Sequence, residues 1–150
     1  MNLALFIFVM FGLLSSLQAK TVELENYSDR PIIEKESRKS SEKLVILLHP
    51  VKTSARFMDL YYPLAYYVND YNFNLVIPSG SKNRKGKRYW SAGEACCDFY
   101  NDGADDLQFL DKLISHYKKK YGSTKIYLMG HFLEMIDSGS KVKDLNSASY

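Results

Sequence analysis

The feature that most constrains the fold is an uninterrupted apolar run, Leu44–Leu48, which stops at His49-Pro50. A strand that is apolar on both faces needs cover on both sides, which is typical of a parallel sheet between helices. Two further runs have strand length, Asn74–Ile77 and Ile126–Met129. We therefore predict an α/β fold with a three-stranded parallel sheet, in which Leu44–Leu48 lies in the middle and right-handed helical crossovers join the strands.

Two segments between these strands have helical periodicity. The stronger, Asp105–Tyr121, begins with two aspartates, ends before Gly122 and repeats apolar residues at steps of three and four: Leu107, Leu110, Ile114, Tyr117 and Tyr121. The other begins at Pro63 and carries Leu64, Tyr67, Val68 and Tyr71 before a left-handed cap at Asn72. A long loop, Ser81 to Gly103, precedes the stronger helix.

The two ends of the chain differ from this middle part. Residues 1–19 carry no charged side chain and end in a small, polar stretch, which predicts a signal peptide cleaved after Ala19 and a secreted or periplasmic protein. An uncleaved anchor and a buried first helix are the alternatives, but the run is too short for a stable membrane span. Residues 20–43 form a polar segment with at most a weak hairpin, near Thr21–Leu24 and Pro31–Glu34. We expect residues 132–150 to be a disordered tail.

Composition excludes several kinds of partner. The 150 residues, 46% hydrophobic and 25% charged, fit one globular domain, and a net charge of +3 is too small to indicate nucleic acid. The basic run from Lys82 to Arg88 is interpreted as a solvated loop rather than a surface for nucleic acid, anionic polysaccharide or membrane. His49, His116 and His131 are too dispersed for a metal site, so neither a metal nor a cofactor is predicted.

The only two cysteines, Cys96 and Cys97, are adjacent in a chain expected in an oxidising compartment. Three alternatives stay open. Both are thiols, or they form a strained vicinal disulfide with each other, or their partner lies in sequence that is missing.

Five motifs occur in order between residues 44 and 131: Leu48-His49, Asn74 to Pro78, Tyr89 to Phe99 (YWSAGEACCDF), Gly103 to Leu107 (GADDL) and Ile126 to His131 (IYLMGH). Together they resemble the secreted polyhydroxybutyrate-depolymerase and feruloyl-esterase group of α/β hydrolases. The resemblance covers the N-terminal half of that catalytic domain, so it implies a truncated α/β-hydrolase fold over residues 44–131. It also implies a serine esterase that works through an acyl-enzyme on an ester of polyester or polysaccharide type.

The resemblance places the nucleophilic serine at Phe132, whose phenyl ring cannot attack an ester. The tight turn of a nucleophile elbow also needs a small residue two positions later, where this chain has Glu134. The acid and the histidine that follow the serine in the family have no counterpart here. We therefore predict no catalytic residue in the chain as written.

The oxyanion loop also departs from the family pattern. His49 matches the family's L-H-G motif, but Pro50 replaces the glycine and has no N–H to donate. Val51 and Lys52 are the alternative donors. The resemblance also makes Trp90 the first choice for contact with a substrate.

These departures predict a protein that resembles a secreted carboxylic ester hydrolase but is inactive. One explanation is an esterase fragment whose reading frame changed or terminated near Gly130; the other is a non-catalytic secreted binding or interaction module. In the complete fold a further strand pairs beyond Ile126–Met129. An open apolar edge there predicts self-association.

Overall fold

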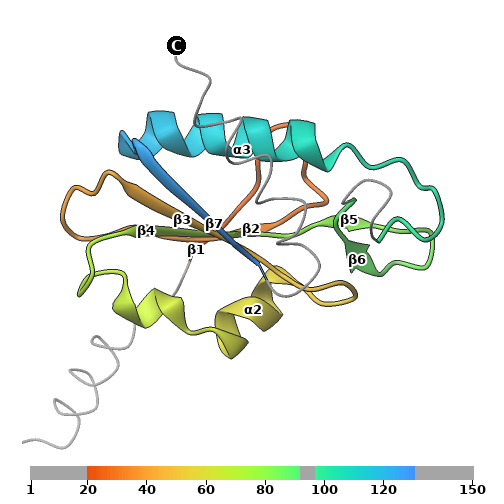
Figure 1. Cartoon of the computed structure of the whole chain (residues 1–150), viewed down its shortest axis with the longest axis horizontal. Coiled ribbons are helices and arrows are strands. Elements are labelled where there is room, and N and C mark those ends of the chain that lie inside the picture. Colours follow the sequence, from red (N-terminus) through yellow and green to blue (C-terminus); the bar gives the residue numbers. More distant parts are fainter. Residues whose placement is uncertain (1–19, 92–96, 131–150) are drawn as a thin grey trace, which may run out of the picture.

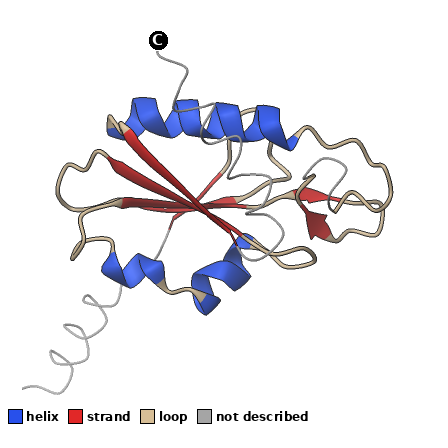
Figure 2. Ribbon diagram, viewed as in Figure 1, coloured by secondary structure: helices blue, strands red, loops and turns tan. Residues whose placement is uncertain are grey.

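The computed structural model describes residues 20–91 and 97–130 as a sheet with helices on both faces (Figures 1 and 2). Five strands form the sheet in the order β1-β2-β4-β3-β7: β1 (Lys20–Val22), β2 (Ile32–Lys35), β4 (Asn74–Pro78), β3 (Lys43–Leu48) and β7 (Lys125–Gly130). The parallel pairs β3–β4 and β3–β7 confirm the predicted core, with the Leu44–Leu48 run in the middle of the three.

The prediction of a sheet with only three strands is wrong. β1 pairs with β2, and β2 pairs with β4, both in antiparallel orientation, so the sheet is mixed. The segment of residues 20–43 is polar by composition, yet Ile32 and Glu34 of β2 are both buried. The β1–β2 pair lies where a weak hairpin is expected, near Thr21–Leu24 and Pro31–Glu34. Its attachment to β4 is not predicted, because a buried carboxylate interrupts the apolar alternation by which a sheet strand is recognised.

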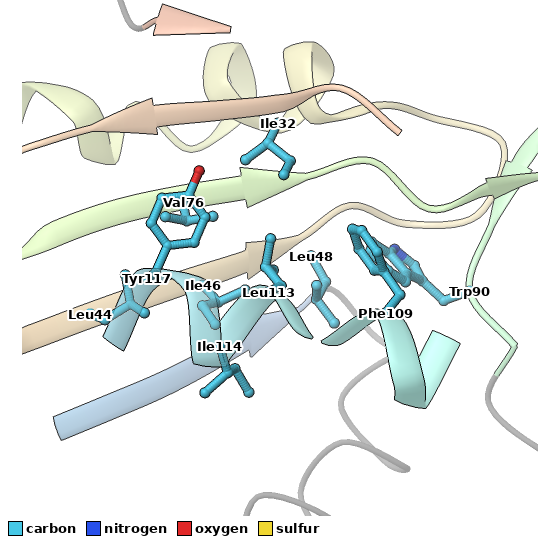
Figure 3. Packing of buried hydrophobic residues seen from close by; sticks show 10 residues of the cluster. All are labelled: Ile32, Leu44, Ile46, Leu48, Val76, Trp90, Phe109, Leu113, Ile114 and Tyr117. Atoms are coloured by element: carbon cyan, nitrogen blue, oxygen red, sulfur yellow. The ribbon is translucent and has the colours of Figure 1, made fainter. Parts of the chain in front are cut away.

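The central strand alternates between the two faces of the sheet. Leu44, Ile46 and Leu48 belong to the cluster beneath α3 (Asp106–Tyr121), together with Phe109, Leu113 and Tyr117 of that helix (Figure 3). Val45 and Leu47 belong to the cluster on the opposite face, beside α2 (Ala55–Tyr61). Burial on both faces explains the continuous apolar run.

Helix α3 confirms the stronger helical prediction. The Asp105 side chain accepts a hydrogen bond from the Gln108 N–H, and Gly122 ends the helix in the left-handed conformation at φ 64°. Four of the five predicted stripe residues face the core: Ile114 and Tyr117 are buried, and Leu110 and Tyr121 pack against the same cluster. Leu107 is instead 46% exposed, and Phe109 and Leu113 complete the buried face.

The predicted helix from Pro63 to Asn72 is wrong. Only a 3-10 turn, η1 (Leu64–Tyr67), forms there, and of the four expected core residues Val68 alone is fully buried. Tyr67 and Tyr71 are 48% and 67% exposed, because their hydroxyl-bearing rings tolerate water and do not hold a helix against the sheet. The left-handed conformation predicted for Asn72 is present, at φ 50°.

Helix α2 was not predicted. It begins at the Ser54 cap, whose side chain accepts from the Phe57 N–H, and it buries Ala55 and Met58. The long loop of residues 81–103 contains a second small sheet, in which β5 (Ser81–Lys82) pairs with β6 (Arg88–Tyr89). No helix in the described part of the chain is long and apolar enough to cross a membrane.

Candidate functional site

The parallel strands bring three chain segments to one edge of the sheet. His49 follows β3, Ser79 and Gly80 follow β4, and β7 ends at Gly130, directly opposite Leu48 in the parallel register. Ligands of open α/β sheets bind outside the carboxyl ends of the strands. This edge is therefore the candidate functional site.

His49 joins two of these segments. Its Nε2 accepts the Gly80 N–H at 2.9 Å, so the ring proton resides on Nδ1, which lies 2.9 Å from the Pro50 carbonyl oxygen. The side chain is completely buried, and this burial lowers the pKa of His49 to about 4, with the nearby Arg88 charge acting in the same direction. A neutral imidazole with both nitrogens engaged cannot serve as a general base, so His49 positions the loops.

The residue at position 80 must be glycine. A Cβ there would collide with the carbonyl group of Tyr89 and would lie 3.2 Å from the Trp90 ring. The backbone of β4's end can approach β6 this closely only without a side chain. This approach aims the Gly80 N–H at His49.

The predicted oxyanion loop is structured by its own hydrogen bonds. The Pro50 carbonyl accepts both the N–H and the hydroxyl of Thr53, at 3.2 and 2.6 Å. Lys52 has φ 66°, and its N–H donates to the Arg88 carbonyl at 2.7 Å. Of the two alternative donors, Lys52 is therefore already used, while Val51 packs against Cys97.

Trp90 anchors the loop after β6. Its indole N–H donates to the His49 carbonyl at 3.0 Å, and its ring packs between His49 and Phe109, with centroid distances of 5.4 and 6.2 Å. Only 4% of the residue is exposed. The geometry brings Trp90 and His49 together at the carboxyl edge, but it leaves little of the indole surface for a ligand.

A buried ion pair that the sequence does not predict lies beside this edge. Arg30 lies 2.5 Å from Asp106 and also contacts the Ser81 hydroxyl, while the other oxygen of Asp106 accepts the Ser91 N–H. Both side chains are 5% exposed or less. Burial raises the pKa of Asp106, and the Arg30 charge opposes that rise. Arg30 thus joins the N-terminal segment to α3 and to the loop around Ser81 and Ser91.

A second polar cluster fastens β2 to the other end of α3. The buried carboxylate of Glu34 accepts the Tyr117 hydroxyl at 3.0 Å and the Lys120 ammonium at 2.7 Å. No local sequence pattern predicts either cluster. The helix dipole alone accounts for Asp105 and Asp106 at the start of α3, and Glu34 lies 83 and 86 residues from Tyr117 and Lys120.

Several predicted site residues lie outside the described residues. Phe132, where the resemblance puts the serine, is one of them, and so are Glu134 and Cys96. Cys97 is described and is disulfide-bonded. Within the described ranges, no three His, Cys, Asp or Glu side chains are grouped so that they could hold a metal ion.

Comparison with known proteins gives a limited result. No protein-family model and no curated protein matches this chain. It is similar to the solved structure of the Francisella virulence factor BioJ, with a TM-score of 0.47 and 19% sequence identity. The matched region covers 85% of this chain and 40% of the BioJ chain, so this chain spans less than half the length of that structure.

Proposed function

We propose that this protein is related to secreted serine esterases of the α/β-hydrolase fold and that it does not itself hydrolyse esters at a useful rate. The observation that carries the proposal is the parallel register of β3 and β7, which sets Gly130 opposite Leu48. In that register the residues following both strands start from the same edge. An esterase needs its nucleophile and its oxyanion loop side by side at such an edge.

Two features support the absence of activity. The position that the resemblance assigns to the serine is Phe132. The neighbouring loop offers Pro50, which has no N–H, and Lys52, whose N–H is bound to Arg88. Loss of the nucleophile alone costs a triad enzyme on the order of a million-fold in rate, and a poor oxyanion site removes part of the remainder.

The test measures hydrolysis of p-nitrophenyl acetate and butyrate by the purified protein, together with labelling by a fluorophosphonate that reacts with activated serines. We expect neither turnover above the buffer rate nor labelling. Turnover that follows the protein through two purification steps would contradict the proposal.

A restoration series makes the test sharper. Phe132→Ser supplies a hydroxyl, and Phe132→Ser with Glu134→Gly also supplies the small residue that the elbow requires. We expect neither variant to gain activity, because a serine without an acid and a histidine is a weak nucleophile. An active Phe132→Ser variant would mean that the site was damaged at one position only.

The second candidate is a non-catalytic secreted module that binds a ligand or partner. It is favoured by the His49 arrangement, in which buried hydrogen bonds fix the loops at the ligand-binding edge although the imidazole has no free nitrogen for catalysis. Export belongs to both proposals. It is tested by fractionating cells and determining the N-terminus of the mature protein, which we expect to be Lys20.

A further inference from the structure

A small basic cavity lies at the carboxyl edge of the sheet, on the α2 face. Its volume of about 300 Å³ is at the lower end of the range for small-ligand pockets. Two guanidinium side chains line it, Arg56 from α2 and Arg88 from β6, together with Thr21, Ser54 and Ser79. None of the described residues that line it is acidic.

The fold explains why these groups converge. Thr21 of β1 stands directly opposite Ile33 of β2, so both side chains project from the same face of the sheet. Ile33 packs against the cluster that contains Ala55 of α2, which identifies this face as the α2 face. Ser79 follows the last residue of β4 and therefore reaches the same corner from the parallel strands.

Arg88 is held in place for binding. Its two terminal nitrogens donate to the Gly80 and Asp29 carbonyl oxygens, at 2.7 and 2.9 Å, and its planar fork retains further N–H donors. Burial lowers the pKa of Arg88, the Asp29 carboxylate opposes this effect, and the Arg30 charge adds to it. An anion in the cavity would offset the cost of keeping this half-buried cation.

Arg56 supplies the second guanidinium group of the site. It is exposed and makes no ion pair with another described residue. The cavity also has an apolar part formed by Pro31, Ile33 and Ala55. Fork-shaped guanidinium groups recognise tetrahedral oxyanions in two-point contacts, and hydroxyl groups complete such sites.

We propose that this cavity binds the phosphate or sulfate group of a small organic anion, held between Arg56 and Arg88, with the organic part against Ile33 and Ala55. Binding of an anion in this cavity does not depend on whether the protein hydrolyses esters. The inference therefore stands or fails separately from the proposed function.

The test is titration of the purified protein with inorganic phosphate, sulfate and phenyl phosphate, followed by amide chemical shifts and calorimetry at low ionic strength. We expect saturable shifts at Thr21, Ser54, Ser79 and Arg88, and tighter binding of phenyl phosphate than of inorganic phosphate. Absence of saturable shifts with all three anions would overturn the proposal. Equal affinities for phosphate and phenyl phosphate would overturn the apolar part of it.

Matched variants assign the effect to the cavity. Arg56→Gln removes one guanidinium from an exposed position, and we expect at least about tenfold weaker binding, as for loss of a charge-assisted hydrogen bond. Arg56→Lys keeps the charge without the fork and should give an intermediate loss. Arg38→Gln makes the same change of charge at an exposed residue outside the cavity, and we expect less than about a twofold change. Equal effects of Arg56→Gln and Arg38→Gln would show that the anion responds to net charge alone and would overturn the site.

Discussion

The two faces of the sheet are covered very differently. On one face, the sixteen residues of α3 lie over the sheet and bury Phe109, Leu113 and Tyr117 completely (Figure 1). On the other, the described part of the chain provides a seven-residue helix and one 3-10 turn as cover. Seven large side chains in residues 57–71 are at least 40% exposed: Phe57, Leu60, Tyr61, Tyr62, Tyr66, Tyr67 and Tyr71.

The difference lies in how polar groups are used as well as in helix length. The α3 face buries the Arg30–Asp106 pair and the Glu34 carboxylate, which the partly exposed Lys120 ammonium contacts. The α2 face has a groove of about 530 Å³ near its β7 side, lined by Phe73, Tyr127 and Met129 among others. The comparison indicates that α3 holds the fold together, while the α2 face is available for contact with other molecules.

The largest test of this comparison breaks the pair beneath α3. Arg30→Met leaves the Asp106 carboxylate buried without a cation, which costs about 3–5 kcal/mol of unfolding free energy. Urea denaturation followed by circular dichroism measures the loss. The matched control is Arg84→Met, because Arg84 pairs with Asp102 while 62% of its side chain is exposed, and we expect a loss of less than about 1 kcal/mol. Similar losses in the two variants would contradict the assignment.

The next test measures how stability depends on the protonation of His49, which lies at the carboxyl ends of the strands. The folded protein holds the pKa of His49 at about 4, below the ordinary value of 6.5, so the unfolded chain binds the proton more readily. The contribution of His49 to the free energy of unfolding is therefore fully present above about pH 6.5. It is lost as the pH falls towards 4, and the loss is on the order of 3 kcal/mol. Unfolding midpoints across this range measure it. In His49→Gln the slope between pH 4 and 6.5 should become shallower, and an unchanged slope would assign the dependence to other groups.

A third test concerns association through β7, the edge strand whose Tyr127 and Met129 lie on the α2 side of the sheet. In the described part of the chain β7 pairs with β3 alone, and its Tyr127 and Met129 side chains are 49% and 43% exposed. We propose that copies of the chain associate through this edge. A lysine on an edge strand opposes pairing, so Met129→Lys should weaken self-association about tenfold in sedimentation experiments. Tyr66→Lys introduces the same charge away from β7, and an equal effect there would exclude the edge.

The smallest test compares two tyrosines. Tyr117→Phe removes the hydroxyl that donates to buried Glu34 and should cost about 1 kcal/mol. Tyr66→Phe removes a hydroxyl from a side chain on a residue that is 66% exposed, and we expect a change within about 0.5 kcal/mol. Thermal unfolding of both variants under one set of conditions is sufficient. A larger loss for Tyr66→Phe would reverse the proposed roles of the two faces.

The same contrast separates what the sequence predicts from what it does not. Helix α3 was predictable because its apolar spacing, the Asp105 cap and Gly122 all agree. The region from Pro63 to Asn72 has helical spacing too, but its repeat depends on tyrosines, whose rings are as stable at a wet surface as in a core. Helical spacing of apolar residues therefore predicts a helix correctly only where a cap or another independent signal agrees with it.

Long-range polar contacts set the other limit. The chain positions of β3, β4 and β7 follow from apolar runs, whereas β2 is held by Glu34 and Tyr117, which lie 83 residues apart. For the candidate site, the sequence singles out the His49 loop and Trp90 only through the resemblance, and the structure brings them together at one edge. It could not indicate that the His49 nitrogens are both engaged, because that depends on where the Gly80 backbone lies.

The attachment of β2 to α3 also determines when the protein can fold during its synthesis. Arg30 and Glu34 leave the ribosome early, but their partners Asp106, Tyr117 and Lys120 are made near the end of the described chain. Contacts between such distant residues form slowly, and domains of this kind complete folding only after most of the chain is available. Until α3 has been made, the Glu34 carboxylate lacks the Tyr117 hydroxyl and the Lys120 ammonium that it contacts in the folded protein, so β2 cannot complete its buried environment.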